Sequence, residues 1–457
     1  MQERGDLPSP KINDDLLRFA FHTPLWFWFA AAGLGSVFAA ALISFGLMLN
    51  FGLTLLGYTQ VQLWGVLITN FVFWVGISHA GVMISAILRL TQAEWRRPVT
   101  RAAEVLTVFA LATAATFPLI HTGRPWRVIY WVFPYDYSRG IFPDVRSALV
   151  WDPSAIFTYL TGSTLFVFIA LIPDLAIARD RATGWRYYFY RAAALGFHGT
   201  KRQWHLQTIA GILLSALILP VFVSVHSIVS WDFAMAIIPG WHSTIFPPYF
   251  VIGAVHSGVS AVLTLMAALR WLFHLEDYIK PDHFDALGRL LVVVATTWLY
   301  FFFLDMYFGV FAREPQELAV WQLRIFTPPY TVVFPFILII GYVIPVGLWL
   351  FRGFRRNIAA MFWSSILVNI ALWMERWLVI VPPLSHKQEF SFMWLTVYQT
   401  QLIEWVLVAG SFALVCLGLL LFSKIFPIIP LFDIKEGQIL KQELQIGRVR
   451  VPAVIRE

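Results

Sequence analysis

Hydrophobic and polar positions alternate along this chain in long blocks, so that apolar segments of about 20 residues or more are separated by polar stretches. Because the hydrocarbon core of a bilayer is about 30 Å thick, a helix needs roughly 20 apolar residues to cross it. The pattern predicts about ten transmembrane helices, over residues 25–49, 62–89, 102–122, 154–177, 206–230, 247–273, 286–311, 328–351, 357–381 and 398–422.

Both ends of the chain are polar. The first 20 residues mix acidic and basic side chains and show no basic region followed by a cleavage site, so we do not expect a secretory signal peptide. The first apolar segment is instead a candidate signal anchor. The tail after Lys424 is expected to lie outside the membrane.

Composition supports the same class of protein. Hydrophobic residues make up 59% of the chain, charged residues only 13%, and the mean hydropathy is +0.71, whereas a soluble domain has about 25% charged residues. Aromatic residues reach 17%, and Trp and Tyr at this density suit the belts at membrane interfaces. The composition therefore predicts an all-α polytopic membrane protein and excludes a soluble enzyme.

The single cysteine, Cys416, lies inside an apolar run. One cysteine excludes an intrachain disulfide, a cysteine-ligated iron–sulfur cluster, a zinc ribbon and a CxxCH haem site. Iron–sulfur or c-haem chemistry would therefore have to reside on a partner protein.

Lys and Arg are distributed unevenly between the loops. With the N-terminus placed in the cytoplasm, the inside loops contain 16 of these residues and the outside loops contain 7. Cytoplasmic loops are enriched in Lys and Arg, so we expect both termini in the cytoplasm. The net charge of +7 thus reflects membrane topology, and no nucleic-acid partner is expected.

An internal repeat is visible in the apolar segments. Residues 76–81 and 253–258 both read Gly-x-x-His-x-Gly, and residues 117–121 lie opposite residues 301–305. The match predicts two tandem four-helix bundles of the same orientation, formed by spans 2–5 and 6–9, with the first and tenth helices peripheral. A chance match in glycine-rich membrane helices is the alternative.

The repeat also divides the chain into expected domains. These are a cytoplasmic N-terminal tail (1–24), a peripheral first helix (25–60), a first bundle (61–240), a second bundle (241–385), a peripheral tenth helix (386–423) and a cytoplasmic tail (424–457).

Ionisable side chains gather near one membrane face, the outer one on the charge count. His121 ends the third span, Asp152 opens the fourth, and His226 and Asp232 close the fifth. Ionisable groups in a membrane are costly, so each is a functional candidate. A His and a carboxylate at an interface can take two protons from the hydroxyl pair of a quinol, and Arg124 could keep a carboxylate ionised.

Each of these residues also has a structural explanation. Asp152 precedes Pro153 and could cap a helix N-terminus. His121 could cap a helix C-terminus, Arg124 could anchor the chain at the interface, and Asp232 could lie in a solvated loop.

Two histidines of the repeat, His79 and His256, sit deeper in the membrane. They could ligate a b-type haem axially, but we favour a hydrogen-bonded pair of core histidines.

The second half carries Asp305, Glu375, Arg376 and Glu404 in or beside apolar runs. They could form a proton relay or interhelical ion pairs. Adjacent residues on a helix do not face one another, so we expect Glu375 and Arg376 to pair with other helices.

Together these motifs resemble the NrfD/PsrC family of quinone-interacting membrane subunits. The resemblance is carried by the two Gly-x-x-His-x-Gly spans, His-Thr-Gly-Arg-Pro at 121–125, Trp-Asp-Pro at 151–153 and Trp-Met-Glu-Arg-Trp at 373–377. It covers nearly the whole chain. In length and in its ten helices the chain is most similar to the ActC-type subunit of alternative complex III, whose ActF-type paralogue has the same fold.

The resemblance implies a chain in the bacterial inner membrane that contains no haem or iron–sulfur cluster and binds quinol, with menaquinol expected, in the first bundle near the outer surface. Electrons would pass to an iron–sulfur partner subunit and then to multihaem c-type cytochrome subunits. A paralogous NrfD-like subunit and small membrane subunits would complete the complex, and the chain alone would be inactive.

The resemblance also implies roles for individual residues. The catalytic residues would be His121, Asp152 and Asp232, and the further quinol-binding residues Arg124, His226 and Trp151. A proton path or its remnant would comprise His79, His256, Asp305, Glu375, Arg376 and Glu404. Asp305 replaces His121 in the second bundle and nothing there repeats Arg124, so we expect one quinol site per chain.

Two other functions compete with this interpretation. One is a secondary transporter that uses the buried charges, and the other is a membrane subunit of a quinol dehydrogenase that contains haem b. The even number of helices in the repeat and the expected absence of broken helices argue against the transporter.

Overall fold

The structure, a computed structural model, describes residues 9–59, 62–128, 148–386, 398–439, 441–446 and 449–454. Ten helical segments in this part of the chain are long and apolar enough to cross a membrane, which confirms the predicted multi-pass protein. They are α2 (Leu25–Phe51), α3 (Val66–Leu90), α4 (Thr100–Ala114) with α5 (Phe117–His121), α7 (Ala148–Arg179), α9 (Lys201–Ala234), α10 (Phe246–Leu272), α11 (Pro281–Phe311), α13 (Tyr330–Leu338) continued by η5 (Ile339–Val343) and α14 (Ile344–Trp349), α16 (Ile358–His386) and α17 (Leu402–Ile425).

Shorter elements connect these helices or flank them. They are α1 (Ser9–Phe21), η1 (Leu53–Leu55), η2 (Glu94–Arg96), η3 (Pro125–Val128), α8 (Trp185–Ala193), α12 (Pro315–Phe326), α15 (Arg352–Arg355), α18 (Leu431–Ile439), β1 (Lys441–Ile446) and β2 (Val449–Val454).

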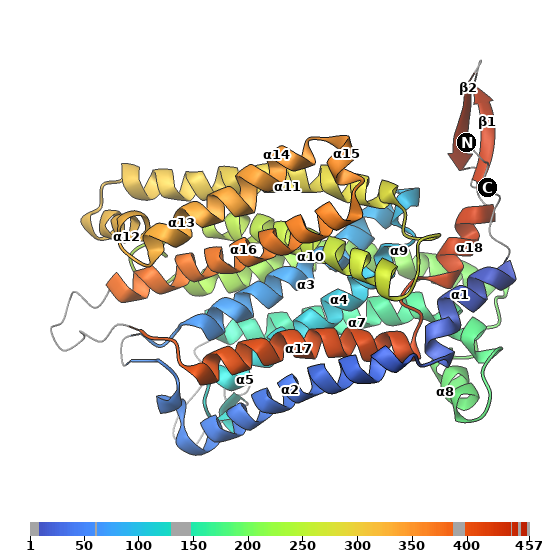
Figure 1. The fold of residues 1–457 in the computed structure, drawn as a ribbon, viewed down its shortest axis with the longest axis horizontal. Helices are drawn as coiled ribbons and strands as arrows, with labels where there is room; N and C mark the ends of the chain where they lie inside the picture. The colour runs from blue at the N-terminus through green and yellow to red at the C-terminus, as the bar shows by residue number, and fades with distance from the viewer. Residues whose placement is uncertain are drawn as a thin grey trace.

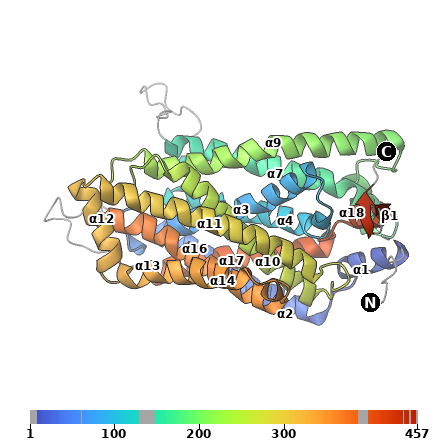
Figure 2. The ribbon, with the colours of Figure 1, turned by 90° about the horizontal axis from the view of Figure 1, so that it is seen from above.

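The long helices form two bundles, as the sequence predicted (Figures 1 and 2). Helices α3, α4, α7 and α9 pack around one another, and so do α10, α11, α13–α14 and α16. The two bundles meet where α3 packs against α10, and the peripheral pair α2 and α17 covers the α3–α4 side. The turn between α9 and α10 falls at the predicted boundary near residue 240. The domain limits themselves stay a prediction.

Small residues let the central helices approach closely. A side chain at Gly76 of α3 would meet Ala254 and Ser257 of α10, and one at Gly81 would collide with the backbone oxygen of Ala103 in α4. In a membrane, helices gain little from hydrophobic association, so close backbone packing at small residues stabilises the contact. The repeated glycines therefore place α3 at the centre, where it is almost entirely buried, whereas α2 is mostly exposed.

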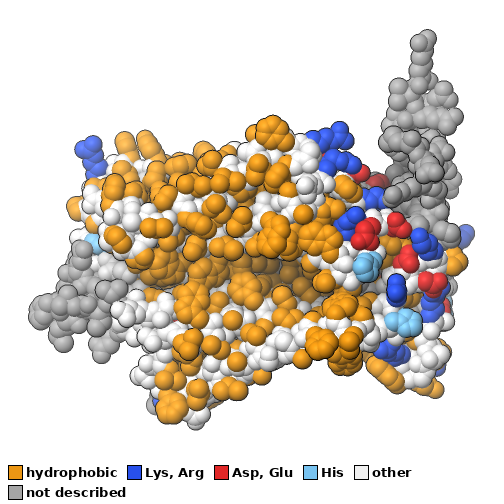
Figure 3. Space-filling model, viewed as in Figure 1, with side chains coloured by type: hydrophobic (Ala, Val, Ile, Leu, Met, Phe, Trp, Pro, Cys, Tyr) orange, Lys and Arg blue, Asp and Glu red, His pale blue; other side chains and the backbone are white. Residues whose placement is uncertain are grey.

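Hydrophobic side chains cover the middle of the molecule, and charged ones collect at the end that holds both chain termini (Figure 3). The short helices α1, α8 and α18 lie at this end (Figure 1). In α8, Trp185 and Tyr188 are exposed, as expected for aromatic residues at a membrane interface. We call this the charged end and the other the distal end.

Two membrane spans are irregular, so the expectation of unbroken helices was wrong. The third span is interrupted between α4 and α5, just before Pro118, and the eighth contains a π-helical segment after Pro335. Proline lacks a backbone N–H and its ring clashes with the preceding turn. Both prolines could have been noticed in the sequence.

The C-terminal tail leaves the membrane region and packs against the charged end. Arg97 of the α3–α4 turn lies 2.7 Å from Glu436 of α18 and donates to the Asp433 carbonyl oxygen at 2.6 Å. Burial alone would raise the pKa of Asp433, but arginines led by Arg96 outweigh burial and lower it. Beyond α18, β1 and β2 form an antiparallel hairpin in which Lys441 faces Val454, the one departure from an all-helical fold in the described residues.

The packing of α3 on α4 can be tested by adding one methyl group. Gly81→Ala should lower the melting temperature of the purified protein, because the new Cβ would collide with Ala103 and Thr107, at a cost of about 1–3 kcal/mol. Gly46→Ala in α2, where a Cβ meets open space, is the control. Equal thermal unfolding of both variants in detergent would contradict the close contact.

The uneven charge at the two ends predicts the direction of insertion. In a Cys416→Ser background, Arg313→Cys at the distal end should react with a membrane-impermeant maleimide added to intact cells, whereas Asp180→Cys at the charged end should react only after lysis. Both positions are exposed, and the charged end is expected on the cytoplasmic side. Labelling of the Asp180→Cys variant in intact cells would reverse the proposed orientation.

Candidate functional site

The polar residues singled out in the first bundle lie at the distal end. His121 is the last residue of α5, Asp152 lies in the first turns of α7, and Asp232 lies in the last turn of α9. Antiparallel neighbours bring the start of α7 beside the end of α9. Residues 129–147, which contain Arg139 and Arg146 of the outside-loop count, lie outside the described part.

Two Trp-Asp pairs from these helices meet side by side. The rings of Trp151 and Trp231 are 5.9 Å apart and nearly perpendicular, and the carboxyl groups of Asp152 and Asp232 lie close to each other. Two acidic side chains held this close together are a candidate site for binding a proton. Their Oδ1 atoms are buried and have no hydrogen-bond partner among the described residues.

The helix boundaries rule out the structural explanations given above for Asp152 and Asp232. Helix α7 begins at Ala148, so Asp152 lies inside it and does not cap its N-terminus. Asp232 belongs to α9 rather than to a loop. Both carboxyl groups are thus held by helices, which fixes their separation more firmly than a loop would.

His121, at the same end of the molecule, lies between aromatic rings. Its ring is 6.4 Å from Phe71 and 6.1 Å from Phe117, and its Nε2 has no partner in the described part of the chain. Arg124 is exposed just beyond α5, which suits an interfacial anchor. No hydrogen bond in the described segments joins His121 to either aspartate.

Further into the membrane, His226 of α9 contacts His79 of α3. Both are fully buried, with ring centroids 4.6 Å apart, and Tyr159 lies 5.0 Å from His79 on the other side. His79 is bonded through Nδ1 to the carbonyl oxygen of Val75.

The predicted pairing of His79 with His256 is wrong. His256 packs against Trp298 of the second bundle at 5.7 Å, and neither of its ring nitrogens has a hydrogen-bond partner among the described residues. Each histidine therefore packs within its own bundle. His79 and His256 occupy equivalent positions in the two repeat copies, but equivalent positions need not be neighbours. Their separate placement does not support the two histidines as ligands of one haem.

Glu375 and Arg376 also differ from expectation. Arg376 Nε lies 3.2 Å from Glu375 Oε2, so these sequence neighbours pair with each other, because the long arginine side chain bends back along α16. Both also contact α10: Tyr249 donates to Glu375, and the Arg376 guanidinium lies 4.6 Å from the Phe250 ring centroid.

Glu404 joins two loops to the start of α17. It accepts hydrogen bonds from the backbone N–H of Gln401 at 2.8 Å and of Gly57 at 3.1 Å, and from the Tyr398 hydroxyl at 2.7 Å. Burial, with the Glu404 charge adding to it, raises the pKa of Tyr398. These contacts give Glu404 a structural role at the distal end.

Several buried charges escaped the sequence analysis. Arg101 Nη2 lies 3.2 Å from Asp174 Oδ2, and Ser85 donates to Glu104, all near the charged end. Arg324, counted as a loop residue, is 2% exposed. A signal existed for each: Glu104 and Asp174 fall within apolar spans, and Arg324 follows Val320 and Trp321 at helical spacing on one buried face.

The sequence is similar to one known protein family and to two named proteins. The family model described as "Polysulphide reductase, NrfD" matches residues 54–385. A putative membrane subunit of a dimethyl sulfoxide reductase from Halobacterium salinarum is 26% identical over 326 residues, covering 70% of this chain and 68% of the relative. The C subunit of selenate reductase from Mesobacillus selenatarsenatis is 20% identical over 422 residues, covering 88% and 93%.

Proposed function

We propose that this chain, which belongs to the polysulphide reductase NrfD family, is the quinol-binding membrane subunit of an oxidoreductase complex. The observation that carries the proposal is the pair of neighbouring carboxyl groups of Asp152 and Asp232, held at the distal end of the first bundle beside two tryptophans that meet edge to face. The named relatives, subunits of dimethyl sulfoxide reductase and selenate reductase, support a role in a redox complex.

Quinol oxidation releases two electrons and two protons, and the site has an acceptor for each proton. The carboxyl pair can accept one proton from a quinol hydroxyl. His121 Nε2, which lacks a partner among the described residues, is available for the second hydroxyl. Both acceptors lie at the end of a helix, from which protons can leave to water at the outer face.

The electrons must leave the chain, because one cysteine cannot hold an iron–sulfur cluster. We therefore place an iron–sulfur partner subunit over the distal end of the first bundle. Arg124 is exposed there and suits contact with a partner or with the quinol. Trp151 and His226 would line the headgroup site, and His79, His256, Asp305, Glu375 and Arg376 would remain candidates for proton transfer.

The type of complex is the finer part of the proposal. Overall length and helix number favour the alternative complex III type, in a bacterial inner membrane, with menaquinol as substrate, multihaem c-type cytochrome partners, a paralogous subunit and proton translocation. The named relatives favour a second candidate, a terminal reductase complex. Subunits that co-purify with the chain separate the two: multihaem cytochromes support the first, and their absence from an active complex supports the second.

Two substitutions test the quinol site. Asp152→Asn and His121→Ala should each reduce quinol oxidation by the assembled complex about 100-fold, because each removes a proton acceptor. The assay is quinol-dependent reduction of the complex's electron acceptor.

Asp180→Asn is the matched control for Asp152→Asn. Asp180 follows the other end of α7, is exposed and pairs with Arg179, so turnover should stay at the wild-type level. Near-normal turnover in both the Asp152 and His121 variants would overturn the site assignment.

A further inference from the structure

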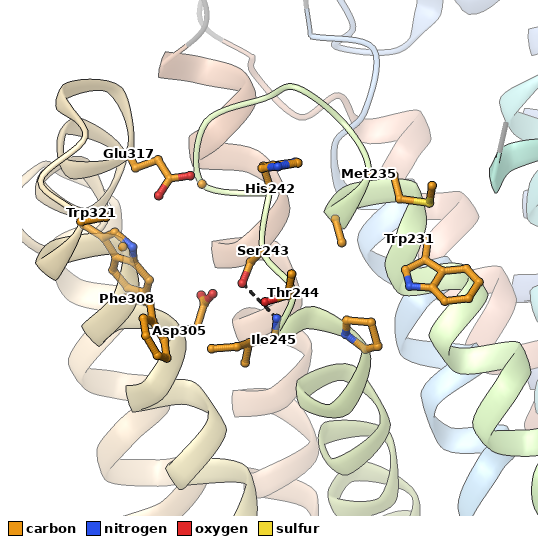
Figure 4. A pocket seen from close by; sticks show the side chains of 15 residues that line it. Trp231, Met235, His242, Ser243, Thr244, Ile245, Asp305, Phe308, Glu317 and Trp321 are labelled. Atoms are coloured by element: carbon orange, nitrogen blue, oxygen red, sulfur yellow. Dashed lines mark hydrogen bonds between the residues drawn. The ribbon is translucent and has the colours of Figure 1, made fainter. Parts of the chain in front are cut away.

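A cavity opens at the distal end, in the second bundle. Its volume is about 540 Å³, within the range of about 300–1,000 Å³ that is usual for small-molecule sites. Figure 4 shows it between α11, α12, the end of α9 and the loop that joins α9 to α10. All of its lining residues belong to the described segments.

One wall of this cavity is polar and the others are aromatic or apolar. Asp305 of α11 and Ser243 of the loop point into it, and Glu317 of α12 and His242 lie toward the rim (Figure 4). Trp231 and Phe308 form the facing sides. A few convergent polar groups on an otherwise apolar wall are typical of a ligand site.

A basic residue, Arg324, lies next to the cavity. The comparison of the two repeat copies did not predict it. Arg324 of α12 donates to the backbone oxygens of Val379 at 3.2 Å and Gly240 at 3.4 Å. Burial lowers the pKa of Arg324, and the Asp305 carboxylate acts most strongly against that shift. The expectation of a single quinol site rested on Asp305 replacing His121 and on the absence of an Arg124 counterpart; Arg324 supplies a basic partner from outside the repeat.

The walls of the cavity are tightly packed. A side chain at Gly309 of α11 would collide with the Trp321 indole, and one at Gly240 would press on Val320, so α12 packs tightly on both α11 and the loop. A rigid site keeps its polar groups in place without a ligand, which lowers the entropic cost of binding.

The rim of the cavity carries exposed apolar side chains. Phe308 and Met235 line it and are 51% and 56% exposed, so a ligand can enter from the lipid phase. An amphipathic ligand with a polar head and an apolar tail suits such an entrance.

We propose that this cavity binds a second quinol headgroup, with the hydroxyls donating to Asp305 and Glu317 and the tail leaving past Phe308 and Met235. Carboxylates only accept hydrogen bonds, so the acidic wall selects the hydroxyl donors of a quinol over the carbonyl acceptors of a quinone. The proposal rests on the proposed function only for the class of ligand. It adds a site in the second bundle, with Asp305 in the place that His121 holds in the first.

A photoreactive azido-quinol probe, applied to the intact complex and followed by peptide mapping, tests this. We expect labelling of residues 240–247 or 305–321 in addition to the first bundle, removed by excess unlabelled quinol. Ala312→Trp should fill the cavity from its rim and abolish the second label while the first remains. Asp305→Asn keeps the volume but removes the charge, and should weaken the second label at least about fivefold, or ~1 kcal/mol.

Ala359→Trp is the control, because Ala359 is exposed near the charged end and the same change there should leave both labels intact. Retention of the first-bundle label in each variant shows that the protein is folded. Labelling confined to the first bundle of the wild type, or a second label that survives both Ala312→Trp and Asp305→Asn, would overturn the second site. Absence of any competed label would instead overturn the proposed function itself.

Discussion

The cost of leaving a polar group unsatisfied in hydrocarbon is the constraint on which the rest of this structure depends. Lipid offers no hydrogen bonds, and many ionisable side chains of the spans, among them Arg101, Asp174, Asp152, Asp305 and Glu375, are buried inside the protein. There they either pair, as Arg101 does with Asp174 and Glu375 with Arg376, or gather where a helix ends. The pairs have structural explanations. The groups at helix ends, Asp152 with Asp232 and Asp305 with Ser243, are the ones placed to meet a ligand.

Close packing of small residues decides which groups end up together. Because Gly76 brings α3 against α10 and Gly81 brings it against α4, helix backbones and small side chains fill the centre of the molecule where the bundles meet. The candidate ligand-binding side chains therefore lie at the distal end, where α7 and α9 present their Trp-Asp pairs. The second bundle of the repeat also has polar residues at the distal end. They are a different set from those of the first bundle and include Arg324 from α12.

The sequence was sufficient for features that depend on one helix at a time. Span length and apolar content identified all ten membrane helices, and the Trp-Asp positions marked the distal end. Features that depend on which neighbouring helix a side chain faces could not be predicted from the sequence. His79 and His256 align in the repeat yet pack in different bundles, and Arg376 pairs with its own neighbour Glu375. The burial of Arg324 was readable, since positions 320, 321 and 324 share one helix face.

The depth of the polar groups distinguishes the competing functions better than helix continuity does. The third span is interrupted just before Pro118 and the eighth contains a π-helical segment after Pro335, so the expected absence of irregular helices no longer counts against a transporter. Transporters, however, bind substrate near the midplane, at half-helix ends that point inward. Here the histidines deeper in the membrane contact aromatic rings, and both acid-lined sites open at the distal end. A ligand that dissolves in the bilayer and presents its polar head at the interface, as a quinol does, fits that placement. A hydrophilic solute crossing the membrane does not.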